Sequence, residues 1–157
     1  MNADHFRQLY EYHRYINRKL WDTCITPLSD AQFTQDVGYS VGSIRNQLVH
    51  LMSVEERWFA GLRGVELPDH ANLEHYPDRA TLRAKWDAVE AEIQAYLEAL
   101  DDTELGQAFT DHLQVWEVLF HVLNHATDHR AQLLAALASL GIPTFPQDYA
   151  LVRMGRI

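Results

Sequence analysis

Apolar residues recur every three or four positions in four segments of the chain, and each segment is long enough to form an amphipathic helix. The expected helices span residues 4–24, 43–63, 79–100 and 114–140. Gly141 and Pro143 follow the last of them in the order that commonly ends a helix. No segment shows the alternation of a β-strand, and no repeat is present. The pattern therefore predicts an all-α, four-helix bundle that forms one domain, residues 1–157.

The segments between these helices are expected to be non-regular. Residues 101–113 should be irregular or briefly extended, and residues 144–157 should be coil or one short turn. The connections between helices 1 and 2 and between helices 2 and 3 are both long. At about 3.3 Å per residue, either connection could cross the whole bundle. Loop length alone therefore leaves the topology open.

Three histidines spaced four residues apart distinguish the last helix: His121, His125 and His129. On a helical wheel His129 falls inside the apolar sector, His125 falls at its edge, and His121 points toward solvent. A single inward histidine is usually a hydrogen-bonded core residue. Two at this spacing can instead offer two nitrogens to one metal ion, as in the HExxH helix of zinc proteases. Ala126 stands where that motif has its general-base glutamate.

A metal site needs a third ligand from another helix. His50, near the apolar face of the second helix, is the candidate, and His13, in the apolar stripe of the first helix, is its competitor. Three histidines with no fourth protein ligand leave an open position, which is the arrangement of a reactive metal site. His121 and Gln132 are expected beside the ligands or at the surface. The residues alone leave the metal and the core interpretations equally open.

Two charged residues fall in apolar sectors, Arg130 on the last helix and Glu55 on the second. Buried arginine and glutamate side chains are almost always paired. The positions therefore predict a salt bridge between Glu55 and Arg130, either direct or through a water molecule. The alternative is that each side chain reaches the rim of the bundle separately.

The formal net charge of −9 disfavours a phosphate backbone or an anionic membrane surface as a partner. No apolar run approaches the length that spans a bilayer, and the N-terminus lacks the apolar core of a signal peptide. Cys24 is the one cysteine, so an intramolecular disulfide is impossible. We expect a soluble, cytoplasmic protein that acts on a small molecule and binds neither nucleic acid nor membrane.

Two stretches of the chain share an order of residues with one known family. In SVGSIRNQLVHLMSVEERWF, His50 follows a Gly-Ser-Ile-Arg type start and precedes a glutamate and a tryptophan: Glu55 or Glu56, and Trp58. In LFHVLNHATDHRAQLL, the pattern Asn-His, three residues, His-Arg-Gly-Gln falls on Asn124, His125, His129, Arg130, Ala131 and Gln132. These motifs resemble the DinB superfamily, and the opening LYEYHRYINRKLWDTC is also similar to it. Asp128 and Ala131 depart from the histidine and the glycine that are common in the family.

This resemblance implies a bundle with an up-down-down-up course and a crossover loop between helices 2 and 3. It also implies a divalent metal, zinc or nickel most often, held by a histidine triad of His50, His125 and His129. Homodimers are frequent in the family. Known activities in the superfamily include transferases and isomerases that use low-molecular-weight thiols.

The leading hypothesis is therefore a thiol-dependent S-transferase, in which the metal lowers the pKa of a thiol that attacks an electrophile. The first alternative is a metal-dependent hydrolase, which needs a general base near the metal. Glu55, Glu56 and Asp111 are possible bases, and the sequence assigns none of them. The second alternative is a non-catalytic bundle that binds a metal or a ligand and acts through its dimer.

Overall fold

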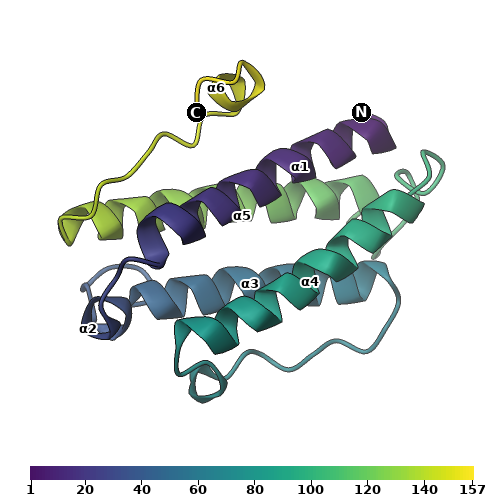
Figure 1. Cartoon of the computed structure of the whole chain (residues 1–157). Coiled ribbons are helices and arrows are strands. Elements are labelled where there is room, and N and C mark those ends of the chain that lie inside the picture. Colours follow the sequence, from purple (N-terminus) through teal and green to yellow (C-terminus); the bar gives the residue numbers. More distant parts are fainter.

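The computed structural model describes residues 1–157 and is entirely helical, so the predicted all-α class is confirmed (Figure 1). Four long helices form the body of the protein: α1 (Ala3–Leu20), α3 (Ile44–Leu62), α4 (Arg79–Ala99) and α5 (Val115–Ser139). Four short elements lie between or after them: the π-helical turn η1 (Trp21–Ile25), α2 (Asp30–Thr34), the 3₁₀ turn η2 (Leu73–His75) and α6 (Tyr149–Arg153).

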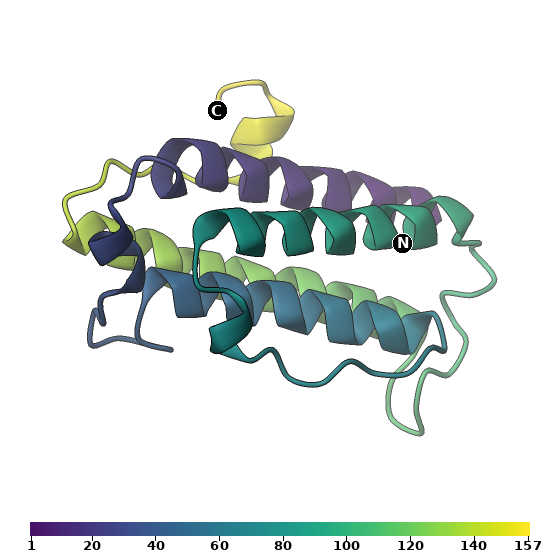
Figure 2. The same ribbon diagram turned by 60° about the horizontal axis from the view of Figure 1, so that its bottom comes forward.

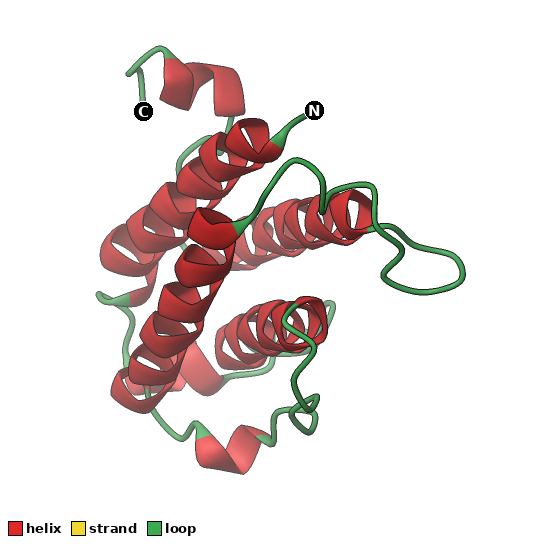
Figure 3. Ribbon diagram, turned by 90° about the vertical axis from the view of Figure 1, so that its right-hand side faces the viewer, coloured by secondary structure: helices red, strands yellow, loops and turns green.

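The long helices pack side by side around one core (Figures 2 and 3). α3 contacts both α4 and α5, and α1 contacts the same two helices from the other side. The order around the bundle is therefore α1, α4, α3, α5. Figures 1 and 2 show the connection of residues 63–78 running along α3, from the end of that helix to the start of α4. No helix combines the length and the apolar character that a membrane crossing requires.

The core is made of the apolar stripes of all four helices, and large fully buried side chains include Phe6, Leu48 and Trp86. Burial of such surface stabilises a fold by about 25 cal/mol per Å². Polar side chains are also buried inside this bundle: His13, Asn17, Ser43, Gln47, Ser53, Glu55, Glu90 and Arg130. Each needs a hydrogen-bond partner, because an unpaired buried polar group is costly.

The predicted helix of residues 4–24 divides into two parts. α1 ends at Leu20 and continues as the π-helical turn η1, in which both the amide and the hydroxyl of Thr26 bond to the Trp21 carbonyl. The short helix α2 was not expected. Its start is a capping box in which Ser29 and Gln32 bond each other's backbone N–H groups, and its Phe33 is buried. α6 agrees with the short turn predicted for the tail.

Candidate metal centre

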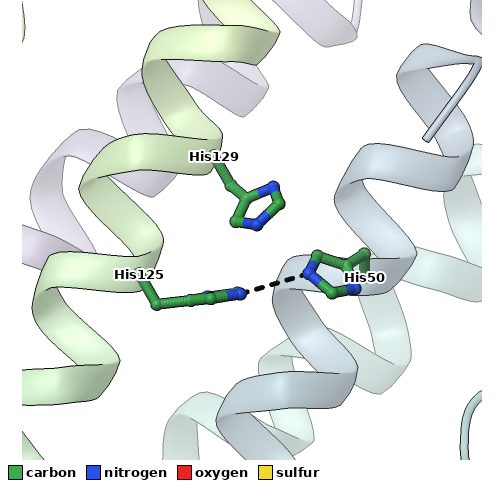
Figure 4. Close-up of side chains that lie close together, drawn as sticks. All are labelled: His50, His125 and His129. Atoms are coloured by element: carbon green, nitrogen blue, oxygen red, sulfur yellow. Dashed lines mark hydrogen bonds between the residues drawn. The ribbon is translucent and has the colours of Figure 1, made fainter. Parts of the chain in front are cut away.

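The three predicted ligands meet between α3 and α5, two adjacent helices of the bundle. Figure 4 shows His125 and His129 on α5 facing His50 on α3. One ring nitrogen from each lies within 4.8 Å of the other two, and all three side chains are half-buried. Nε2 of His50 and Nε2 of His125 lie 3.1 Å apart. The structure thus brings together the residues that the sequence proposed as a triad.

The spacing of these nitrogens fits a small divalent cation. Two nitrogens that each lie about 2.0–2.1 Å from a tetrahedral zinc ion are about 3.3 Å apart. The separation of 3.1 Å between His50 and His125 is close to that value. The widest nitrogen pair of the cluster, within 4.8 Å, would have to close by at most about 1.5 Å. Rotation of half-buried imidazoles supplies movements of that size, so the residues present could hold a metal ion.

The site keeps its imidazoles uncharged. Burial, followed by the neighbouring histidine charges, lowers the pKa of His125 from its ordinary value of 6.5 to about 4. Burial also lowers the pKa of His50, with His129 adding to the effect, and it lowers the pKa of His129. Neutral imidazole is the form that binds metal. At neutral pH the three nitrogens are therefore free of competing protons.

These lowered pKa values make the metal-free protein sensitive to acid. Between pH 6.5 and about 4, His125 binds a proton in the unfolded chain and stays neutral in the folded one. The unfolded state then binds more protons, so the free energy of unfolding should fall as the pH drops through this window. Urea unfolding from pH 7 to pH 4 measures it. His125→Asn should flatten the dependence, and an unchanged slope would contradict the assignment to His125.

Gln47 supports His129 from α3, one turn before His50. Its amide nitrogen lies 3.0 Å from Nδ1 of His129 and 3.2 Å from the carbonyl oxygen of the same residue, and its side chain is buried. Gln47 therefore holds the orientation of this ring from α3.

We expect Gln47→Leu to weaken metal binding by about 10- to 100-fold, because His129 loses the partner of its Nδ1. Competition with a chromophoric chelator gives the affinity. Gln94→Leu, at an exposed position of α4, is the control for loss of a glutamine. Equal affinities for Gln47→Leu and Gln94→Leu would remove Gln47 from the site.

The two residues predicted to flank the ligands lie near the cluster but outside it. His121 is exposed, with its ring centroid 6.0 Å from that of His125 and 5.0 Å from that of Trp58. Gln132 accepts hydrogen bonds from Ser40 and from the Gln47 amide, at 2.5 Å and 3.2 Å. Gln132 thus extends the polar network that holds His129.

His13, the competing third ligand, lies elsewhere in the core and does not join the cluster. It stands between Glu55 and Arg130, which the sequence predicted to form a direct or water-bridged salt bridge. Nε2 of His13 is 2.9 Å from Oε1 of Glu55, and Nδ1 is 2.8 Å from the Arg130 guanidinium. Both charges are buried, as predicted. The predicted contact between them is wrong, because the imidazole of His13 from α1 lies between the two groups and bonds to each. A wheel of α3 and α5 could not show a side chain supplied by a third helix.

The hydrogen bonds fix the tautomer of His13. Arginine can only donate, so Nδ1 of His13 accepts from Arg130, and Nε2–H donates to Glu55. The second oxygen of Glu55 accepts from the indole N–H of Trp86 at 3.0 Å. Burial lowers the pKa of Arg130, and the negative charge of Glu55 opposes that shift. A neutral imidazole thus connects two buried opposite charges in the middle of the bundle.

Comparison with known proteins adds one result. Residues 1–155 match the DinB family, a range that contains all three histidines of the cluster and the helices that carry them. No curated protein matches the chain.

Proposed function

Because the chain belongs to the DinB family, we propose that it is a metal-dependent enzyme that transfers a low-molecular-weight thiol to a small electrophile. His50, His125 and His129 are its metal ligands, and zinc or nickel is the ion. Imidazole nitrogen suits both metals. When bound, the metal would lower the pKa of a thiol in its open position.

One observation carries this proposal: three neutral, half-buried imidazole nitrogens converge, and no carboxylate or thiolate completes the set. Structural zinc sites normally have four protein ligands, whereas sites that take a substrate or cofactor keep a position open. The partial exposure of the cluster would let a small thiol enter between α3 and α5.

Two of the three carboxylates that the sequence offered as a general base already have partners, and the third, Asp111, is exposed. A hydrolase needs a general base that is free to take a proton. Glu55 already accepts hydrogen bonds from His13 and Trp86 in the core. Glu56 forms an ion pair with Lys85 on α4 at 2.5 Å. A thiol ionises near neutral pH with much less help than water does, so it depends less on such a base.

Side chains beside the triad can serve the transfer. The Trp58 ring packs against His121 and lies 5.9 Å from Phe109, which gives an aromatic wall for the apolar part of an electrophile. His121 is exposed beside His125, and its imidazole would accept the proton of an incoming thiol. In the transfer the thiolate sulfur would form a bond to carbon, the leaving group would depart with its electron pair, and the thiol proton would pass through His121 to solvent.

The proposal is tested by measuring the metal content of the purified protein and then mixing the protein with 1-chloro-2,4-dinitrobenzene and each of a panel of low-molecular-weight thiols. We expect chloride release that depends on thiol and metal, that stops after chelation, and that is lost in His125→Ala. Water-driven hydrolysis of ester substrates without thiol would support the hydrolase alternative. Stoichiometric metal with neither reaction would support the non-catalytic dimer and overturn the proposal.

We further propose the up-down-down-up course for the four long helices, with residues 63–78 as the crossover. The path of that connection along α3 supports it, because a connection that returns to the starting end makes α3 and α4 run in the same direction (Figure 1). The pairing of α1 with α4 and α5 is consistent with the same course.

A further inference from the structure

A row of aromatic rings leads away from the candidate metal centre. The ring centroid of His121 lies 6.0 Å from that of His125, and the ring centroid of Trp58 lies 5.0 Å from that of His121. Phe109 extends the row, with its ring centroid 5.9 Å from that of Trp58. His121 is exposed, and Trp58 and Phe109 are half-buried. The row therefore connects a candidate metal ligand with aromatic surface that is open to solvent.

Phe109 is carried by a turn of residues 107–114, which lies at the end of the bundle where α3 ends (Figure 2). The Phe109 amide donates to the carbonyl oxygen of Leu113 at 2.7 Å. The hydroxyl oxygen of Thr110 accepts from the amides of His112 and Leu113, at 3.2 Å and 3.1 Å. These bonds close the turn on itself, so the backbone holds Phe109 in place beside α3.

Gly61 makes room for the Phe109 ring. It follows Trp58 by three residues and so lies on the same side of α3. A β-carbon at Gly61 would lie 2.9 Å from Cζ and 3.2 Å from Cε2 of Phe109, whereas carbon atoms pack at about 3.5–4.0 Å. A glycine inside a helix costs stability relative to alanine. Its presence here lets the Phe109 ring lie on the backbone of α3, beside the indole of Trp58.

An apolar side chain borders this aromatic surface. Leu67, in the connection after α3, is 52% exposed, and its Cδ2 would lie 3.7 Å from a β-carbon at Gly61. Trp58, Phe109 and Leu67 carry no charge. An exposed apolar surface beside a reactive centre is typical of a ligand site, because elsewhere it would gain nothing from water.

The chemistry of thiol transfer selects the kind of ring that this surface would bind. A thiolate substitutes an aromatic carbon readily when the ring is electron-poor. The sulfur forms a bond to that carbon, the leaving group departs with the bonding electron pair, and the thiol proton passes to solvent. The faces of indole and phenyl rings are negative, so they attract an electron-poor ring more strongly than an electron-rich one. One property of the ring thus favours both its binding and its reaction.

We propose that Trp58 and Phe109 form a binding site for an electron-poor aromatic ring, with Gly61 positioning Phe109. This inference rests on the proposed function, because it identifies aromatic electrophiles as the substrate class of the thiol transfer. The bound ring stacks on the two side chains. Only His121 separates Trp58 from His125 in the row, so the reacting carbon faces the metal position.

The probe is 1,3-dinitrobenzene, which is electron-poor and has no halide to displace. It is titrated into the metal-free protein, and two-dimensional NMR follows the indole N–H signals, with that of Trp58 identified by its absence from Trp58→Phe. The comparison ligand is 1,3-dimethoxybenzene, an electron-rich ring of similar shape. We expect a saturable shift of the Trp58 signal with a Kd on the order of 1 mM. Dimethoxybenzene should bind at least about threefold more weakly.

Phe109→Ala should weaken dinitrobenzene binding about fivefold, because one of the two stacking rings is lost. Phe120→Ala is the matched control, since Phe120 is 52% exposed on α5 and is not among the rings that contact Trp58. Gly61→Ala should weaken binding to a similar extent by displacing the Phe109 ring, and it should have no further effect in Phe109→Ala. Alanine favours a helix over glycine, so Gly61→Ala still tests the site if Phe109→Ala fails to fold.

In the transfer assay, Phe109→Ala should raise the KM for 1-chloro-2,4-dinitrobenzene about fivefold. It should leave kcat/KM for iodoacetamide, a small aliphatic electrophile, at the parental value. Dinitrobenzene binding without any thiol transfer would overturn the proposed function and the substrate class, but the ring site would stand. Equal binding of the two rings, equal effects of Phe109→Ala and Phe120→Ala, or no saturable shift of the Trp58 signal would overturn the ring site, and thiol transfer measured in the same protein would leave the proposed function intact.

Discussion

His125→Ala should reduce the affinity for zinc on the order of a hundredfold to a thousandfold. Structural zinc sites with four ligands bind with about 10–16 kcal/mol, which corresponds to about 3 kcal/mol for each ligand. His125 belongs to the cluster, with its ring centroid 5.1 Å from that of His50 and 4.3 Å from that of His129. Its loss leaves two imidazoles, which cannot hold the ion against a competing chelator.

The matched control is His121→Ala, on the same helix one turn earlier. It also removes an imidazole, but that side chain is exposed and outside the cluster. Elemental analysis and chelator competition on the parent and both variants give stoichiometry and affinity. His121→Ala should keep the stoichiometry of the parent. Loss of metal from His121→Ala, or retention of parental affinity by His125→Ala, would contradict the ligand set.

The helical period of the chain was enough to predict the class of the fold and the positions of the four long helices. The period is strong where a stripe faces the core, as it does through Phe6 of α1 and Leu48 of α3, both buried. The five-residue helix α2 was missed, since it is too short for a period and rests on the capping box of Ser29 and one buried Phe33.

The candidate ligands could be predicted because their signal is local. A spacing of four residues puts His125 and His129 on one side of a helix, and the family motifs point to His50. Gln47 was missed, although it precedes His50 by three residues and so shares its face of α3. Position shows that a glutamine faces a site, but only the structure shows which ring nitrogen it reaches.

The partner of Arg130 could not be predicted from wheels, because a wheel gives the direction of a side chain and nothing about neighbouring helices. Three helices meet at this point: α1 contributes His13, α3 contributes Glu55, and α5 contributes Arg130. Their sequence separations of 42 and 117 residues carry no local signal. The charged residues in apolar sectors nevertheless indicated correctly that both charges are buried.

Glu55, His13 and Arg130 form a buried relay of hydrogen bonds. Changes to this relay are expected to give the largest stability effects in the chain. Glu55→Gln should lower the free energy of unfolding by about 3–5 kcal/mol, because the fully buried Arg130 keeps its charge and loses its counterion. The amide must also turn a donor toward either the Trp86 indole or Nε2–H of His13. Arg130→Met should cost a similar amount, since it leaves the Glu55 charge buried and His13 without a donor.

Removing both charges together should cost much less than the sum of the two single changes. This coupling is measured by urea unfolding of the parent, Glu55→Gln, Arg130→Met and the double variant. All four proteins are treated with a chelator, so that bound metal does not contribute to their stability. A total stability of about 5–15 kcal/mol for a typical domain leaves room for one such loss at low temperature. Strictly additive effects would mean that the two charges are stabilised independently.

His13→Phe distinguishes the relay from a direct ion pair. Phenylalanine keeps the aromatic shape but removes one hydrogen bond from Glu55 and one from Arg130. If the imidazole connects the charges, His13→Phe should destabilise the protein about as much as removing either charge, by about 3–5 kcal/mol. If the two charges contacted each other directly, the same change would cost at most about 1–2 kcal/mol, the value of an ordinary hydrogen bond. A small effect of His13→Phe would therefore contradict the relay even if Glu55 and Arg130 remained strongly coupled.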